Sequence, residues 1–95
     1  MIYHPAAREE LIDSMRWYEA HRAGLGDEFL QAVVDVEAKI AEAPNRWTEI
    51  EPGFRKLNTD RFPYGLIYQQ VAGHVEIVAV MHLSRRPGYW RVRAK

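Results

Sequence analysis

Residues 62–82 read FPYGLIYQQVAGHVEIVAVMH and contain the strongest strand signal in the chain. Nearly every position from Val75 to Met81 is apolar, as expected of a central strand that is covered on one side and half covered on the other. Ala72-Gly73 provides a short turn, so Phe62–Val71 and His74–His82 are predicted to form a β-hairpin. Phe54–Leu57 is predicted to be a further strand.

Two helices are predicted upstream of these strands. Within residues 6–22 the apolar side chains recur every three or four positions, at Ala7, Leu11, Met15 and Tyr18. Within residues 25–43 a second apolar stripe is formed by Phe29, Val33, Val36 and Ile40. The connection Ala23–Gly26 is short, with Gly24 suited to a left-handed cap, so the helices are expected to form an antiparallel hairpin.

The remaining segments complete a predicted α+β fold. Ile2 and Tyr3 are expected to form a short edge strand, and Pro5 suits the first turn of a helix. Residues 44–53 are expected to be a loop. The order is β-α-α-β-β-β, in which an N-terminal strand, an antiparallel helical hairpin and a three-stranded antiparallel meander form one small sheet. Residues 1–95 are thus one domain, ending in a basic tail from Ser84 to Lys95.

Composition excludes several classes of protein. The chain has no cysteine, which excludes disulfides, thiolate metal sites and cysteine nucleophiles. No apolar run is close to the roughly 18 residues that span a bilayer. The N-terminus also lacks the basic and apolar regions of a signal peptide. The sequence therefore predicts a soluble cytoplasmic protein with no membrane partner.

Charge is divided unevenly along the chain. Residues 1–52 contain five basic and eleven acidic residues, whereas residues 53–95 contain eight basic and two acidic ones. Net charges of −6 and +6 cancel in the whole chain. The basic half is suited to phosphate or to an acidic protein surface, unless it pairs with the acidic half within the fold. Because the basic residues cluster beside Tyr89 and Trp90, an external partner is favoured.

Motifs for metal or cofactor chemistry are lacking in this sequence. His4, His21 and His74 do not have metal-ligand spacing, so no metal site is predicted. Neither Ser14 nor Ser84 lies in a nucleophile turn. No Gly-rich phosphate loop is present, and no small-molecule cofactor is predicted.

Five patterns follow one another along the chain. They are His4–Ala7, Trp17–Glu19, Gly24–Phe29, Phe62–Tyr68 and His82–Trp90. In this order and spacing they resemble the RelE/ParE superfamily of toxins from type II toxin–antitoxin pairs, over nearly the whole chain. The resemblance implies a helical hairpin packed on an antiparallel sheet, in agreement with the pattern above. It also implies a cognate antitoxin as partner.

Members of this superfamily act in two ways. RelE-like members are ribosome-dependent endonucleases that cut mRNA without a metal, whereas ParE-like members bind DNA gyrase and lack the nuclease residues. The resemblance thus implies a growth-inhibiting toxin, of the kind linked to plasmid stabilization, with gyrase or the ribosome and its mRNA as target. The ParE-like branch is favoured because Gly65 stands where RelE-like nucleases place an arginine. A member that has lost toxicity and only binds a partner is a third possibility.

The resemblance also indicates which residues form a site. If the chain is RelE-like, the catalytic residues are Lys56, Arg61, Arg85 and Tyr89. The residues expected to bind the target or antitoxin are Arg85, Arg86, Tyr89, Trp90 and Arg91. Since Arg55 and Lys56 are adjacent on a strand, at most one of them faces a shared site. An acidic antitoxin segment would complement the basic half, so we expect charge reversal at Arg85 and Arg86 to weaken its binding. The plainer interpretation is that these side chains only keep the surface solvated.

Overall fold

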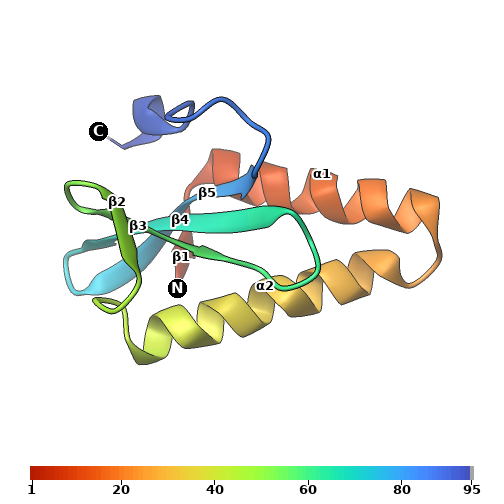
Figure 1. Ribbon diagram of the computed structural model, residues 1–95, viewed down its shortest axis with the longest axis horizontal. Helices are drawn as coiled ribbons and strands as arrows, with labels where there is room; N and C mark the ends of the chain where they lie inside the picture. Colours follow the sequence, from red (N-terminus) through yellow and green to blue (C-terminus); the bar gives the residue numbers. More distant parts are fainter. Residues whose placement is uncertain (95) are drawn as a thin grey trace.

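The computed structural model describes residues 1–94. The helices and strands, in chain order, are β1 (Ile2–Tyr3), α1 (Pro5–His21), α2 (Leu25–Glu42), β2 (Thr48–Glu51), β3 (Phe54–Asn58), β4 (Tyr64–Val71), β5 (His74–His82) and a 3₁₀ turn, η1 (Arg91–Arg93). The strands form a single sheet in the order β1-β5-β4-β3-β2, and the helices pack on one of its faces (Figure 1). The predicted α+β layout is confirmed.

Pairing in the sheet is mixed. Strands β2 to β5 form an antiparallel meander, while β1 pairs in parallel with β5 at one edge. The meander therefore has four strands, because Thr48–Glu51, predicted to be part of a loop, is the edge strand β2. Three of its four residues are exposed, so no burial pattern marks it in the sequence.

The turn between β4 and β5 is formed as predicted. Ala72 and Gly73 both have positive φ angles, of 49° and 81°. Positive φ at both central positions is the geometry of the two-residue turn that matches the twist of a β-hairpin. The register from Val71 opposite His74 to Tyr68 opposite Ile77 follows from it, and a bulge then shifts the pairing by one residue as far as Tyr64 opposite His82.

The helical hairpin has a tight connection. Gly24 has a φ of +89°, and the Glu19 carboxylate accepts hydrogen bonds from the N–H groups of Gly24 and Gly26, both at 3.0 Å. These bonds satisfy donors at the start of α2 and lower the pKa of Glu19. Each helix then presents its predicted apolar stripe to the sheet.

The core under the helices is aromatic. All four stripe residues of α2 are buried, and they meet the buried Leu66 and Tyr68 of β4. Phe29 is 0% exposed and its ring lies 5.3 Å from that of Phe62 and 4.9 Å from that of Tyr64. These ring pairs join the second helix to the start of β4.

The opposite face of the sheet carries a second apolar cluster. It consists of Ile67, Val78, Ala79, Met81 and Trp90, with Phe54 and Tyr89 packed against it. A register shift in the β4–β5 pairing leaves Val78 without a partner in β4. Because of this bulge, Val78 and Ala79 both face this second cluster.

Candidate functional site: a cationic cleft under the C-terminal segment

The C-terminal segment, Leu83–Ala94, follows β5. In Figure 1 it lies above β4 and β5, on the opposite side of the sheet from α2. Its anchor is Trp90, which is 2% exposed and lies against Phe54 with 5.0 Å between ring centroids. No helix or strand is predicted for this segment from the sequence, and in the structure it lies across the sheet.

A network around Glu10 of α1 also holds the segment. Arg93 forms two bonds to the Glu10 carboxylate, Nη1 to Oε1 at 2.8 Å and Nη2 to Oε2 at 2.9 Å. The Tyr89 hydroxyl donates to Glu10 Oε2 at 2.7 Å. Both side chains of the ion pair are mostly buried, at 14% and 15% exposure, so this pair is shielded from solvent and its bidentate geometry fixes the segment.

Glu10 and Arg93 also cover part of the edge of β5. Because β1 pairs with β5 only at Ile2–Tyr3, that edge is open from Val78 onward. There Glu10 accepts from the Val80 N–H at 3.0 Å, and Arg93 donates to the Val78 carbonyl at 3.1 Å. The C-terminal segment is thus attached to the sheet through backbone as well as side-chain bonds.

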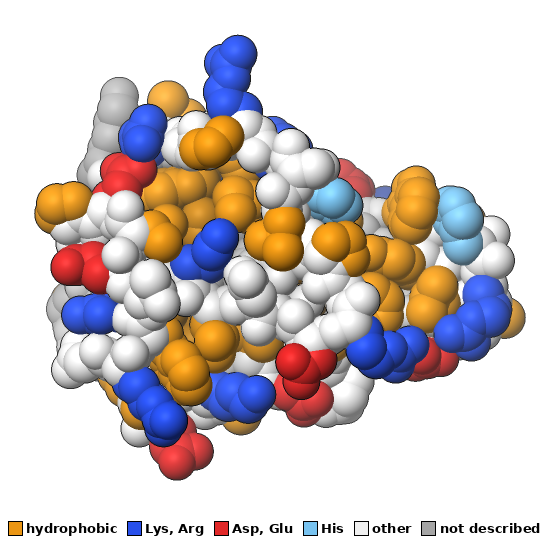
Figure 2. Space-filling model, in the orientation of Figure 1, with side chains coloured by type: hydrophobic (Ala, Val, Ile, Leu, Met, Phe, Trp, Pro, Cys, Tyr) orange, Lys and Arg blue, Asp and Glu red, His pale blue; other side chains and the backbone are white. Residues whose placement is uncertain are grey.

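Between the C-terminal segment and the sheet lies a cleft of about 330 Å³. Its apolar lining includes Ile67, Met81 and Trp90. Ile50 and Leu83 also line it and are exposed. Its cations are Lys56 of β3, and Arg85 and Arg91 of the C-terminal segment. Figure 2 shows the hydrophobic patch below this segment with Lys and Arg side chains at its border. The cleft therefore combines an apolar floor with a cationic rim.

One carboxylate lies among these cations. Glu51 of β2 lines the cleft, and its Oε2 accepts a hydrogen bond from Arg91 Nε at 2.6 Å and forms an ion pair with Arg91 Nη2, also at 2.6 Å. Arg85 instead stacks on the Tyr89 ring, with its guanidinium 4.0 Å from the ring centroid. Within residues 1–94, neither Lys56 nor Arg85 has a carboxylate partner.

Gly65 makes room for Lys56. A Cβ at position 65 would lie 2.6 Å from Asn58 Oδ1 and 3.2 Å from the Lys56 side chain. The Lys56 stem therefore packs over the bare backbone of Gly65, where a larger residue would displace it. Position 65 faces the same side of the sheet as Lys56, so the cation that RelE-like nucleases carry there has no counterpart in this cleft.

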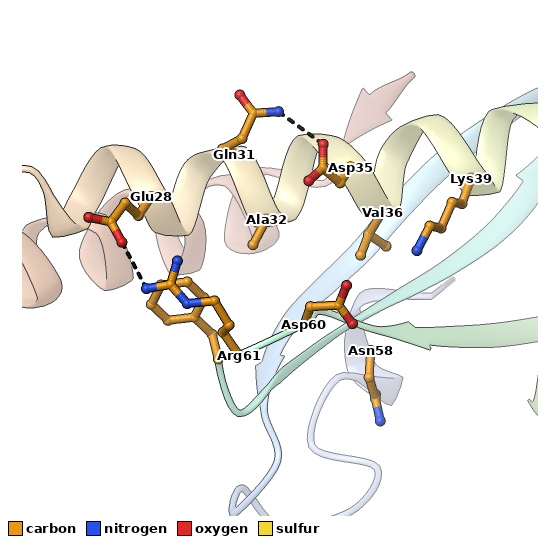
Figure 3. A pocket seen from close by; sticks show the side chains of 10 residues that line it. Glu28, Gln31, Ala32, Asp35, Val36, Lys39, Asn58, Asp60 and Arg61 are labelled. Atoms are coloured by element: carbon orange, nitrogen blue, oxygen red, sulfur yellow. Dashed lines mark hydrogen bonds and ion pairs between the residues drawn. The ribbon is translucent and has the colours of Figure 1, made fainter.

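Two of the four residues named for catalysis share the cleft and two do not. Lys56 and Arg85 line it together. Arg61 lies in the turn before β4 and reaches Glu28 of α2, at 2.8 Å, beside a different hollow (Figure 3). The Tyr89 hydroxyl is committed to Glu10, and burial and that bond raise its pKa above the ordinary value of 10.0.

The residues expected to bind a partner are also placed unequally. Arg85 and Arg86 are exposed, and only Arg85 lines the cleft. Trp90 lines the cleft but is 2% exposed, and its side chain supports the segment as part of the second cluster. Arg91 lines the cleft but is held by Glu51.

Two further residues matter that sequence reasoning missed. Glu10 looks like one of several solvated carboxylates of the first helix, and its partner Arg93 is 83 residues away. Glu51 falls in the segment predicted to be a loop, so nothing in the sequence places it opposite Arg91. Both contacts depend on how the C-terminal segment folds back.

The described residues lack a metal-binding cluster and a membrane-spanning helix. Residues 1–94 contain no group of three or more His, Cys, Asp or Glu side chains able to hold a metal ion. In the same part of the chain, no helix has the length and apolar character to cross a membrane.

Comparison with known proteins identifies a structural neighbour. No family model matches the chain, and no curated protein matches it significantly. Among solved structures, a chain of the chromosomal ParDE TA system from P. aeruginosa superposes with a TM-score of 0.61 and 16% sequence identity. The match covers 86% of this chain and 92% of that chain. At this identity it shows a shared fold: the chain has a fold that also occurs in a ParDE toxin–antitoxin system.

Proposed function

We propose that the chain is the toxin of a type II toxin–antitoxin module, that it stops growth by binding DNA gyrase as ParE-like toxins do, and that a cognate antitoxin neutralises it in the cytoplasm. The shared fold with a chain of a ParDE system supports the class of module. The composition of the cleft supports binding over cleavage.

The main observation in favour of binding is that the four residues named for catalysis do not all come together in the cleft. Cleavage of RNA without a metal requires a base for the 2′-hydroxyl, cations for the phosphate and an acid for the leaving oxygen. The cleft supplies two unpaired cations, Lys56 and Arg85. The Tyr89 hydroxyl donates its hydrogen bond to Glu10, and Arg61 extends toward α2. A cleft that lacks these groups is better suited to hold a partner than to transfer protons.

A RelE-like mRNA endonuclease is the second candidate. It is favoured by the shared position of Lys56 and Arg85, which would stabilise negative charge on a phosphate. A chain with this fold that binds a partner without being toxic is the remaining alternative, since the same cations suit an acidic protein surface.

Two cell-free assays with the purified protein separate these candidates. We expect inhibition of DNA supercoiling by gyrase, and intact message in a ribosomal translation reaction. Site-specific cleavage of the message that is lost in Arg85→Ala, but retained in Arg8→Ala, would contradict the proposal and support the endonuclease. Arg8 is an exposed residue of α1 outside the cleft, so it serves as the control. Harmless expression of the chain without an antitoxin, with gyrase and message both unaffected, would support the non-toxic alternative.

A further inference from the structure

The ligand of the cleft must match two chemical properties at once. Lys56 and Arg85 present positive charge without a carboxylate partner in residues 1–94. Ile67 and Met81 form an apolar floor, and the exposed Ile50 and Leu83 flank it. A simple ion would leave this apolar surface in contact with water, whereas an anionic group attached to an aliphatic side chain would cover both.

The aromatic rings of this region are already occupied. Trp90 is 2% exposed, and the Tyr89 ring has Arg85 at 4.0 Å and Arg93 at 5.0 Å from its centroid. Single-stranded nucleic acid is bound largely by stacking its bases on free aromatic faces. Trp90 lines the cleft with almost no exposed surface, so within residues 1–94 the cleft offers no free aromatic face for stacking, and its chemistry favours an acidic peptide over an RNA or DNA strand.

Glu51 shows how a carboxylate fits into this cleft. Its carboxylate is bound by Arg91 at 2.6 Å, beside Lys56 and Arg85. The pairing of β2 with β3 is irregular between Glu49 and Glu51, so this end of the edge strand is less firmly held. The Arg91 side chain is also 61% exposed, and ion pairs at such exposure add little to stability. A carboxylate from outside can therefore replace Glu51 on Arg91 at small cost.

We propose that the cleft binds an acidic peptide segment of a partner protein, with carboxylates on Lys56 and Arg85, an aliphatic side chain on Ile67 and Met81, and Glu51 as an internal competitor for Arg91. The identification of this partner with an antitoxin rests on the proposed function. The site itself depends only on the cleft.

A binding measurement with a synthetic probe tests the site directly. The probe is a fluorescein-labelled 12-residue peptide of Glu, Asp and Leu, titrated with the full-length protein at physiological salt and followed by fluorescence anisotropy. We expect saturable binding, weakened at least tenfold by Lys56→Glu with Arg85→Glu. A peptide with Gln and Asn in place of Glu and Asp should bind at least tenfold more weakly as well.

Two single variants make the test specific to this site. Arg86 lies next to Arg85 but outside the cleft, so Arg86→Glu should weaken binding much less than Arg85→Glu. Glu51→Gln removes the competitor and should tighten binding by about two- to fivefold, the range expected from a weak exposed ion pair. Because this variant gains affinity, a folding defect cannot mimic its effect.

Several outcomes would overturn the site. They are equal loss of affinity in Arg86→Glu and Arg85→Glu, no gain in Glu51→Gln, or tighter binding of a labelled single-stranded RNA that displaces the peptide. A failure of this site can be told apart from a failure of the proposed function, because the titration involves neither gyrase nor growth. Gyrase inhibition without peptide binding would refute the site alone, and peptide binding without any toxicity would refute the toxin function alone.

Discussion

The two faces of the sheet are covered by different means. The first lies under two long helices, whose apolar stripes bury a continuous core built around Phe29. The second lies under the short C-terminal segment, which one buried tryptophan and a few ion pairs hold in place. The helices bury the central residues of this first face. Incomplete coverage on the second face leaves the cleft, so the main core and the proposed binding site lie on opposite sides of one sheet.

The largest effect is expected from breaking the helix-covered face. Phe29→Ala removes a fully buried ring that packs against Tyr18, Phe62 and Tyr64. We expect the free energy of unfolding to fall by about 3–5 kcal/mol, because the lost contacts leave a cavity. Urea denaturation followed by circular dichroism measures it. A loss below about 1 kcal/mol would mean that this face is not the main source of stability.

Breaking the second face should cost less and act locally. Trp90→Ala removes the anchor of the C-terminal segment, and we expect a loss of about 2–3 kcal/mol, at or below the lower end for a buried aromatic ring, because a short segment can detach by itself. Limited proteolysis with trypsin should then cut after Arg85 while the helical signal is retained. Cooperative loss of the helices in this variant would show instead that the two faces form one unit.

A substitution at Glu10 tests how much the ion pair and hydrogen bonds, rather than the packing of Trp90, hold the C-terminal segment. Glu10→Gln keeps an acceptor for the Val80 N–H but weakens the bonds to Arg93 and Tyr89. We expect a loss of about 1–2 kcal/mol, in the range for bonds to a charged group. Denaturation of the variant is compared with that of Glu9→Gln, an exposed neighbour on α1. An equal, negligible effect in both variants would mean that the tryptophan alone holds the segment.

The smallest effect concerns the helical hairpin and depends on pH. Hydrogen bonds from Gly24 and Gly26 lower the pKa of Glu19 below its ordinary value of 4.5. The stability that this carboxylate adds is therefore present above pH 4.5 and is lost as the pH falls through the lowered value. Glu19→Gln should have a slightly lower melting temperature than the wild type at pH 7, and the difference in melting temperature should vanish toward pH 3. A gap that persists at pH 3 would assign the effect to something other than the charge.

Sequence reasoning succeeds where a pattern is local. The stripe of α2 and the Ala72-Gly73 turn are specified by neighbouring residues, and both are found as predicted. It misses β2 because an exposed edge strand of four residues between Pro44 and Pro52 has no burial pattern. The bounds of the helices are otherwise close to those expected.

The site is less predictable because its contacts are distant in sequence. The basic character of the cleft can be read from the clustered arginines, but the direction of each side chain cannot. Arg61 has a φ of 67° in the turn before β4 and extends to α2 instead of to Lys56. Trp90 is conspicuous in the sequence, yet only the folded segment shows that it faces inward.

The coverage of the β5 edge has a consequence for assembly. Unpaired backbone groups on an edge strand are templates for a strand of another molecule. Here the Val78 carbonyl and the Val80 N–H are bonded to Arg93 and Glu10, so this part of the ladder is closed to a neighbouring copy. Arg93→Ala would free the Val78 carbonyl, and self-association that grows with protein concentration would reveal it.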